Sequence, residues 1–400
     1  MENVKKGLTN IGKFRIIYFL FFFGDALFTA FISLYLVSID LNALEKGIVL
    51  GLVPIGLFLG NLFYSRFAKS YKDNIRLLKI ISLIEGLLIL FFGFIKNFYV
   101  ICVFAFLINF NNSSYFQIQD ATLSMSLKKH MANYSTVRIF GSLAYLVALL
   151  CNSVVFKYIN YQILFLISGC CMFLAFAFLF SLDKDYYDEK RDEQEETKEE
   201  IKEEKRSLFR NRAFIFVLLF NLLTIGSYNV NSYYYPMYLN SLGILDTTYS
   251  LFTGLGVGVE TIALFLCTFI FKKSKSYKLP LLLGGLFRVI FCLCVTFIKD
   301  PNVLIAVGMV FNGIGTGLTL YGNVQFVHEL FGDKKITKAL TFIGGFLYLN
   351  VAIGNFVLPY IMDRISYPYI AFTLSCLEIL GLVALLFAKN KKVEKGNTKA

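Results

Sequence analysis

An aspartate and an arginine stand in two segments that are otherwise apolar enough to cross a membrane. Asp120 and Arg138 lie on either side of the polar turn Lys128–His130. If the two segments form a helical hairpin, a rise of about 1.5 Å per residue places both side chains roughly 8 to 11 Å from the same membrane face. Antiparallel helices pack about 8 to 10 Å apart, so the two side chains can meet or hold one ligand between them. A charge inside a bilayer costs on the order of 3 kcal/mol, and this cost indicates a substrate site.

Other charged residues interrupt the apolar segments. Asp25 stands near the middle of the first segment, and Glu260 and Arg288 stand at matching depths on either side of a basic turn. The hairpin argument therefore predicts that Glu260 and Arg288 can form a second pair. Glu85 and Glu378 also interrupt apolar runs, but their segments have the pattern of packing helices and no function is predicted for them.

Polar residues are concentrated in three apolar segments, 98–127, 212–240 and 301–330. Such faces do not point at lipid; they line water or bind a ligand, or they form hydrogen bonds between helices. The density of amides, hydroxyls and tyrosines favours a cavity for a neutral, hydroxyl-rich solute. The residues predicted to complete this cavity are Asn109, Asn112, Tyr228, Asn229, Asn312 and Asn323.

The composition indicates a membrane protein with many spans. The chain has 400 residues, of which 57% are hydrophobic and 16% charged, and its mean hydropathy is +0.64. At roughly 20 residues per span, about twelve helices fit, so we predict an all-α fold. The predicted spans are 14–37, 47–67, 76–95, 98–127, 134–156, 161–182, 212–240, 247–271, 279–298, 301–330, 337–361 and 367–388.

The charge distribution predicts the topology. The net charge of +12 comes from basic clusters in alternate loops, so it indicates cytoplasmic loops and not a nucleic-acid partner. Both termini are therefore predicted to be cytoplasmic, with a basic tail at the C-terminus. The eight cysteines fall inside apolar spans without metal-ligand spacing, and we predict packing roles for them and no metal site.

A charge-rich stretch divides the chain into two halves of six spans. The predicted units are residues 1–182, a cytoplasmic linker at 183–212, and residues 213–400. The halves share a pattern, because the segment that begins at Phe140 and contains Gly141-Ser142 is echoed by the one that begins at Ile343 and contains Gly344-Gly345. Two six-helix halves related by a parallel repeat are typical of secondary transporters, and the small residues would permit close helix contact.

These residues together resemble the major facilitator superfamily, and within it the group that contains lactose permease and the nucleoside–proton symporters. The resemblance rests on Asp120, on Arg138 at the start of Arg-Ile-Phe-Gly-Ser, on Glu260 at the end of Gly-Val-Gly-Val-Glu, on Arg288, and on Phe311-Asn-Gly-Ile-Gly-Thr-Gly. It implies a twelve-span fold in which Asp120 and Arg138 bind the solute. Tyr145 falls where lactose permease has a ring that stacks on its sugar, so Tyr145 is expected to stack on a ring-shaped solute.

The chain departs from this group at the position of the coupling acid. Gly315 stands where lactose permease has its proton-carrying glutamate, and Asn312 replaces the group's usual histidine. Another acid must then take the proton, or the coupling ion differs. Glu260 has Arg288 at its own depth, whereas Asp25 has no evident cation. We therefore expect Asp25 to carry the proton, with Glu260 and Arg288 as a switchable pair; a sodium site at Asp25 is the alternative.

The predicted function is a symporter in the bacterial plasma membrane that imports a small polar solute, most simply a sugar or an oligosaccharide. Nucleosides and aromatic acids are the alternative solutes, and a membrane nutrient sensor that does not transport is the alternative class. No nucleophile–base set, phosphate loop or metal cluster points to an enzyme. We expect no cofactor, and a monomer whose partners are the solute, the coupling ion and the bilayer.

Overall fold

The computed structural model describes residues 10–64, 66–68, 70–130, 135–182, 209–271, 278–362 and 364–388. All regular structure in these ranges is helical. The helices of the first half are α1 (Asn10–Thr29), α2 (Ile32–Ser38), α3 (Ala43–Tyr64), α4 (Tyr71–Phe92), α5 (Phe98–Asn112), α6 (Tyr115–His130), α7 (Ser135–Val155) and α8 (Tyr161–Leu179).

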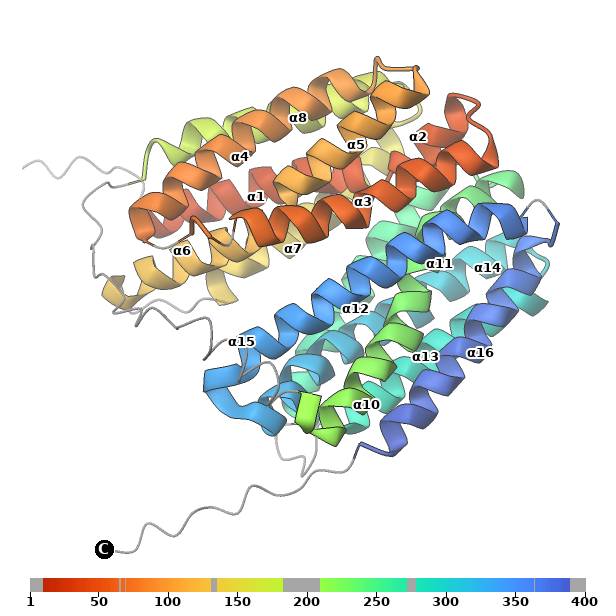
Figure 1. Cartoon of the computed structure of the whole chain (residues 1–400). Helices are drawn as coiled ribbons and strands as arrows, with labels where there is room; N and C mark the ends of the chain where they lie inside the picture. Colours follow the sequence, from red (N-terminus) through yellow and green to blue (C-terminus); the bar gives the residue numbers. More distant parts are fainter. Residues whose placement is uncertain are drawn as a thin grey trace, which may run out of the picture.

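The second half contains two short π-helical segments in addition to its α-helices. Its elements are α10 (Arg212–Phe220), the π-helix η1 (Asn221–Ile225), α11 (Gly226–Ser241), α12 (Asp246–Ile270), α13 (Lys278–Phe297), α14 (Pro301–Val307), the π-helix η2 (Gly308–Asn312), α15 (Gly313–Met362) and α16 (Tyr367–Leu386). Helix α15 carries the end of the tenth span and the whole of the eleventh, and Figure 1 shows that it turns back on itself between them.

The predicted all-α fold with twelve spans is confirmed. Within the described residues, eleven helices are long and apolar enough to cross a membrane by length and composition. Helix α4 is the twelfth, and it fails that criterion because three charged residues, Arg76, Lys79 and Glu85, fall within even its most apolar 18-residue window. The orientation of the termini stays a prediction, and residues 183–208 of the predicted linker and the tail 389–400 lie outside the described residues.

Four spans are interrupted within their length, and they are the first, fourth, seventh and tenth. Turns at residues 30–31 and 113–114 separate α1 from α2 and α5 from α6, while η1 and η2 interrupt the other two spans. Inside a membrane such irregular backbone is tolerated only where protein or a water-filled cavity surrounds it, and π-helical segments often mark functional sites. The interruptions therefore locate the functional interior of the bundle.

The two halves lie against each other along two helix pairs, α3 with α15 and α7 with α12. Hydrogen bonds join the halves from Asn355 to the carbonyl of Leu50 at 2.9 Å and from Ser250 to the carbonyl of Leu149 at 2.6 Å. These contacts lie at the end of the molecule that carries α2 and α14, on the right of Figure 1. The halves are thus closed together at this end.

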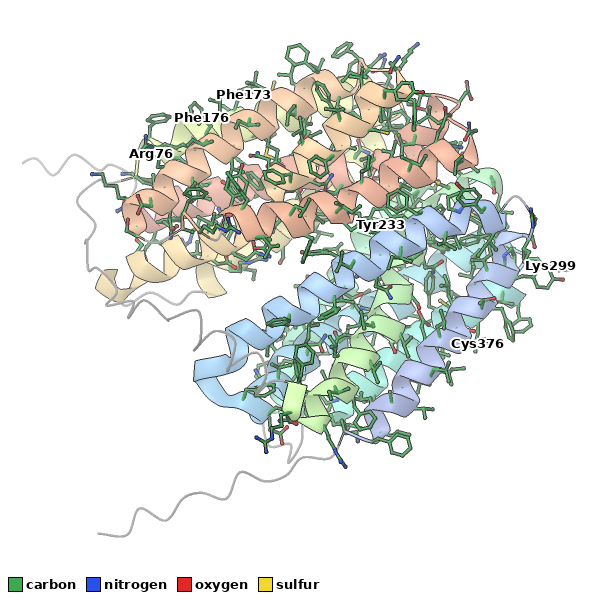
Figure 2. The ribbon with its side chains drawn as sticks, in the orientation of Figure 1. Arg76, Phe173, Phe176, Tyr233, Lys299 and Cys376 are labelled. Atoms are coloured by element: carbon green, nitrogen blue, oxygen red, sulfur yellow. The ribbon has the colours of Figure 1, made fainter. Side chains whose placement is uncertain are left out.

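The outer surface of the bundle is apolar. Large exposed hydrophobic side chains include Phe91, Val103, Phe265 and Ile353, and Figure 2 shows Phe173 and Phe176 of α8 pointing away from the bundle. Lipid is the environment in which such a surface is stable.

The small residues behave differently from one another. A Cβ atom at Gly56 of α3 would lie 2.7 Å from the carbonyl oxygen of Phe106 on α5, so this glycine permits close helix packing. The prediction of close packing is also met at Gly345, where a Cβ atom would lie 3.2 Å from Phe58. It is wrong at Gly344, where a Cβ atom would meet nothing within 4 Å, because this side of α15 faces open space.

We expect Gly56→Ala to destabilise the protein, since the α3 and α5 backbones must move apart, at a cost of about 1 to 3 kcal/mol. The matched control is Gly344→Ala, which has room for the methyl group and should be neutral or slightly stabilising. Thermal unfolding of the two variants in detergent measures the difference. Equal melting temperatures would contradict the tight packing of α3 on α5.

Candidate functional site

Arg138 on α7 and Asp120 on α6 form an ion pair, with 3.7 Å between Nε and Oδ1. Tyr18 of α1 donates a hydrogen bond to the same carboxylate oxygen at 2.5 Å, and the guanidinium carbon lies 4.6 Å from the ring centre of Phe22. A Cβ atom at Gly141 would lie 2.9 Å from Nη1 of Arg138, so the glycine makes room for the guanidinium. The structure thus brings the hairpin pair together, and its role in binding stays a prediction.

A cavity of about 460 Å³ lies between the two halves. Its volume is in the range of small-molecule sites. Side chains from α1 and α7 in the first half face side chains from α11, α12, α13 and α15 in the second. The sequence-predicted residues that line this central cavity are Arg138, Tyr145, Tyr228, Glu260 and Asn312.

The lining of the central cavity combines rings, hydroxyls and two opposite charges. Arg138 contributes the positive charge from one half and Glu260 the negative charge from the other. The aromatic rings are those of Phe22, Tyr145, Tyr228, Tyr235, Tyr249, Phe252 and Phe291, and the hydroxyl groups also include Ser142, Ser232, Thr253 and Thr316. Such a surface can stack against a ring and exchange hydrogen bonds with hydroxyl groups.

Tyr145 presents its ring, and not its hydroxyl proton, to this cavity. Its hydroxyl oxygen lies 3.0 Å from Oγ1 of Thr29, and Thr29 donates its own proton to the carbonyl of Asp25 at 2.8 Å. Tyr145 is therefore the donor in the bond to Thr29. The face of the ring is what remains for a solute.

Arg288 lies behind the cavity wall and does not form an ion pair with Glu260 among the described residues. Its guanidinium donates to Thr319 at 2.9 Å and to Thr316 at 3.4 Å, and its central carbon lies 3.8 Å from the ring centre of Tyr228. The side chain is 2% exposed, and its Nε and Nη1 atoms have no hydrogen-bond partner. Matching depths predicted the pair, but the arginine points toward α15 and the tyrosine ring, while Glu260 lines the cavity.

Sequence reasoning missed the groups that surround Arg288. Glu378 of α16 is fully buried and accepts a hydrogen bond at 3.5 Å from the thiol of Cys292, which lies one helical turn beyond Arg288 on α13. The acid was visible as a charge in an apolar run, but nothing in the sequence placed α16 beside α13. Glu85 of α4 is also fully buried, and neither of its carboxyl oxygens has a hydrogen-bond partner.

Two asparagines predicted for the central cavity lie elsewhere. Asn323 exchanges two hydrogen bonds with Asn221, at 3.0 and 2.8 Å, so its amide joins two helices and does not line the cavity. Asn229 does not line the cavity either; its carbonyl accepts a bond from Ser232. The structure thus does not bring these two residues to the central cavity, and their role in solute binding stays a prediction.

Asn109 and Asn112 line a second cavity, of about 250 Å³, together with Asp25. This second cavity is bounded by α1, α3, α5 and α6 in the first half. Tyr233 of α11 and Tyr348 of α15 close it from the second half, and Figure 2 shows Tyr233 lying between the halves. Asp120 lines neither cavity, because its carboxylate is directed at Arg138 and Tyr18.

Asp25 is 6% exposed and has an amide, not a cation, as its partner. Nδ2 of Asn112 donates to Oδ1 of Asp25 at 2.8 Å. Arg138, the cation of the central cavity, is paired with Asp120 and not with Asp25. The expectation that Asp25 has no cation at its depth agrees with this arrangement, and its role in coupling stays a prediction.

Comparisons with known proteins agree with the fold. The sequence model of the MFS_1 like family matches residues 11–385. An uncharacterised transporter, YwbF of Bacillus subtilis (strain 168), is 22% identical over 391 residues, which cover 94% of this chain and 93% of that protein.

Two solved transporter structures are similar in fold. A mutant of the nucleoside transporter NupG superposes with a TM-score of 0.82 at 12% identity and covers 96% of this chain and 100% of its own. A D-xylose-proton symporter superposes with a TM-score of 0.71 at 13% identity, with 97% and 98% covered.

The ring of Tyr145 should contribute to the binding of any solute in the central cavity. Tyr145→Ala is expected to weaken binding by about 1 kcal/mol, roughly fivefold, because a stacking face is lost. Tyr145→Phe keeps the ring and loses only the bond to Thr29, so it should bind nearly as well as the wild type. Equilibrium binding to both variants measures this, and equal affinities for Ala and Tyr would rule out stacking.

Proposed function

From the premise that this chain belongs to the MFS_1 like family and is a membrane transporter, not an enzyme, we propose that it imports a small polar solute by cation-coupled symport. The solute binds in the central cavity, and the two halves rock about it to expose it to each side of the membrane in turn. We place the protein in a bacterial plasma membrane, with both termini in the cytoplasm, on the strength of its basic loops.

The observation that carries this proposal is that each half supplies one charge to the same cavity. Arg138 comes from the first half, and Glu260 comes from the second, with Asn312 beside it on the interrupted tenth span. A solute that contacts both halves binds differently when they move, and only such differential binding couples a ligand to a conformational change. Uptake of solute into proteoliposomes that contain the purified protein tests transport and separates it from a sensor.

The first candidate solute is a sugar or an oligosaccharide. Hydroxyl groups suit Arg138, Glu260 and Asn312, because charge-assisted hydrogen bonds are roughly twice as strong as neutral ones. The fold likeness to a D-xylose-proton symporter is compatible with this class.

A nucleoside is the second candidate, favoured by the number of aromatic rings in the cavity lining. A flat base can stack on Tyr145 or Tyr228, while the ribose hydroxyls meet the charged groups. A thermal-shift screen of sugars, nucleosides and aromatic acids distinguishes the classes, because a ligand raises the melting temperature only when it binds the folded protein.

Coupling requires a group whose occupancy by a cation changes between the two states. Asp25 is the proposed group, since it is buried, has no cationic partner in the described part of the chain, and lines the second cavity. Burying an uncompensated carboxylate costs free energy that a bound cation or proton recovers. The hydrogen bond between Thr29 and Tyr145 connects this acid's helix to the solute cavity.

The ion pair of Asp120 and Arg138 should be required for binding. Arg138→Lys loses the planar fork, and Asp120→Asn loses the charge that holds Arg138 in place, so each should weaken solute binding by about 2 kcal/mol, roughly 30-fold. Arg76→Lys is the matched control, because Arg76 is exposed at the end of α4 (Figure 2) and should bind as the wild type does. Unchanged affinity in both site variants, measured on protein that still inserts and folds, would refute the assigned site.

Asp25→Asn should separate coupling from binding. We expect the variant to lose uphill accumulation and to keep exchange of solute across the membrane, because exchange requires no net movement of the cation. Glu85→Gln serves as the control, since Glu85 is buried but lines neither cavity. Accumulation that survives in Asp25→Asn would transfer the coupling role to another acid, with Glu260 tested next.

A further inference from the structure

The first-half wall of the second cavity carries acceptor oxygens, and the N–H groups of the same amides are already used in hydrogen bonds. Asn112 directs its amide nitrogen to Asp25 at 2.8 Å, and Asn109 directs its own to the carbonyl of Ala105 at 2.8 Å. The amide of Gln117, oriented so that it donates, reaches the carbonyl of Ser113 at 3.0 Å. Because a carboxylate and a carbonyl only accept, these partners fix which atom of each amide is the nitrogen.

The hydroxyl protons of the serine and threonine on the same wall are also already used in hydrogen bonds. Ser113 donates to the carbonyl of Phe110 at 2.8 Å, and Thr29 donates to the carbonyl of Asp25 at 2.8 Å. What this wall offers is therefore the second carboxylate oxygen of Asp25, the amide oxygens and the lone pairs of the hydroxyls. The amide oxygen of Asn112 is buried and has no hydrogen-bond partner within the described ranges, in a residue that is 7% exposed.

Oxygen acceptors with a single carboxylate are the ligand set of a hard monovalent cation. Divalent cations such as Ca²⁺ are usually held by several carboxylates, and softer metals prefer nitrogen and sulfur. The described residues contain no group of three His, Cys, Asp or Glu side chains that could hold such a metal. A bound proton would use only one acceptor oxygen. The amide oxygens of Asn109, Asn112 and Gln117 would then have nothing to bind.

We propose that the second cavity binds a sodium ion, with Asp25, Asn109, Asn112 and Gln117 as its oxygen ligands and water completing its shell. The volume of about 250 Å³ accommodates an ion that keeps part of its hydration. This inference rests on the proposed symport, because it names the coupling cation of that function.

The position of the cavity suits a coupling ion. Both interrupted spans of the first half border it, through Thr29 on α1 and Ser113 after α5. Tyr233 and Tyr348 close it from the second half, so its shape changes when the halves move. Thr29 also accepts the hydrogen bond of Tyr145, so a cation at Asp25 acts on the helix that positions the ring in the solute cavity.

The experiment measures binding of radioactive sodium to the purified full-length protein without solute, at constant ionic strength and pH, with choline replacing sodium. The wild type should bind sodium saturably. Asp25→Asn should abolish binding, and Asn109→Leu, which keeps the carboxylate, should weaken it at least tenfold. Glu85→Gln should bind sodium as the wild type does, because Glu85 does not line the cavity.

Absence of saturable sodium binding in the folded wild type would overturn the proposal, and so would binding that both Asp25→Asn and Asn109→Leu leave unchanged. If methylammonium displaced radioactive sodium at a lower concentration than unlabelled sodium does, the cavity would be assigned to an organic amine. That result would also overturn the proposal. The assay is independent of transport. Sodium binding without solute uptake would refute the proposed function alone, and uptake without sodium binding would refute the cation site alone.

Discussion

The cost of charge inside a hydrocarbon layer governs this structure. Arg138 and Asp120 offset that cost by pairing with each other, and Tyr18 and the ring of Phe22 complete their surroundings. Arg288 is surrounded instead by the hydroxyls of two threonines and the ring of Tyr228. Each charge is thus held by groups from a different helix, so the polar interior joins the helices of each half while the apolar residues face lipid.

The interrupted spans explain where the interior can change. Regular helices satisfy their own backbone, whereas turns at residues 30–31 and 113–114 and the segments η1 and η2 free backbone groups in the centre of the bundle. The two cavities border three of these interruptions, at Ala30, at Ser113 and at η2, and share α1 and α11 as walls. The bond between Thr29 and Tyr145 crosses from one cavity to the other, so a ligand in either one can influence the other.

The sequence predicts how deep a residue lies in the membrane better than it predicts which way the side chain points. Hydropathy located the twelve spans, and equal distance from a turn was enough to bring Asp120 to Arg138, because a hairpin of adjacent helices leaves little freedom. For Glu260 and Arg288 the same argument did not give the contacts of the side chains, since Glu260 lines the cavity while Arg288 donates to Thr319, and their role as a switchable pair stays a prediction. Asn109 and Asn112 line the second cavity and not the central one. The rotation of a helix about its axis and the packing of distant spans are tertiary properties, and a single sequence does not determine them by its pattern.

The central claim, that the halves move about a shared cavity, is tested most directly by distances between spin labels in a variant whose native cysteines have been replaced. One pair joins residues 76 and 209 at the end opposite α2 and α14, and the other joins residues 158 and 299 at the end where the halves meet, all of which are exposed. On addition of solute and cation the account predicts that the distance distribution shortens for the first pair and lengthens for the second. Distances that do not change, or that change in the same direction at both ends while solute is bound, would contradict it.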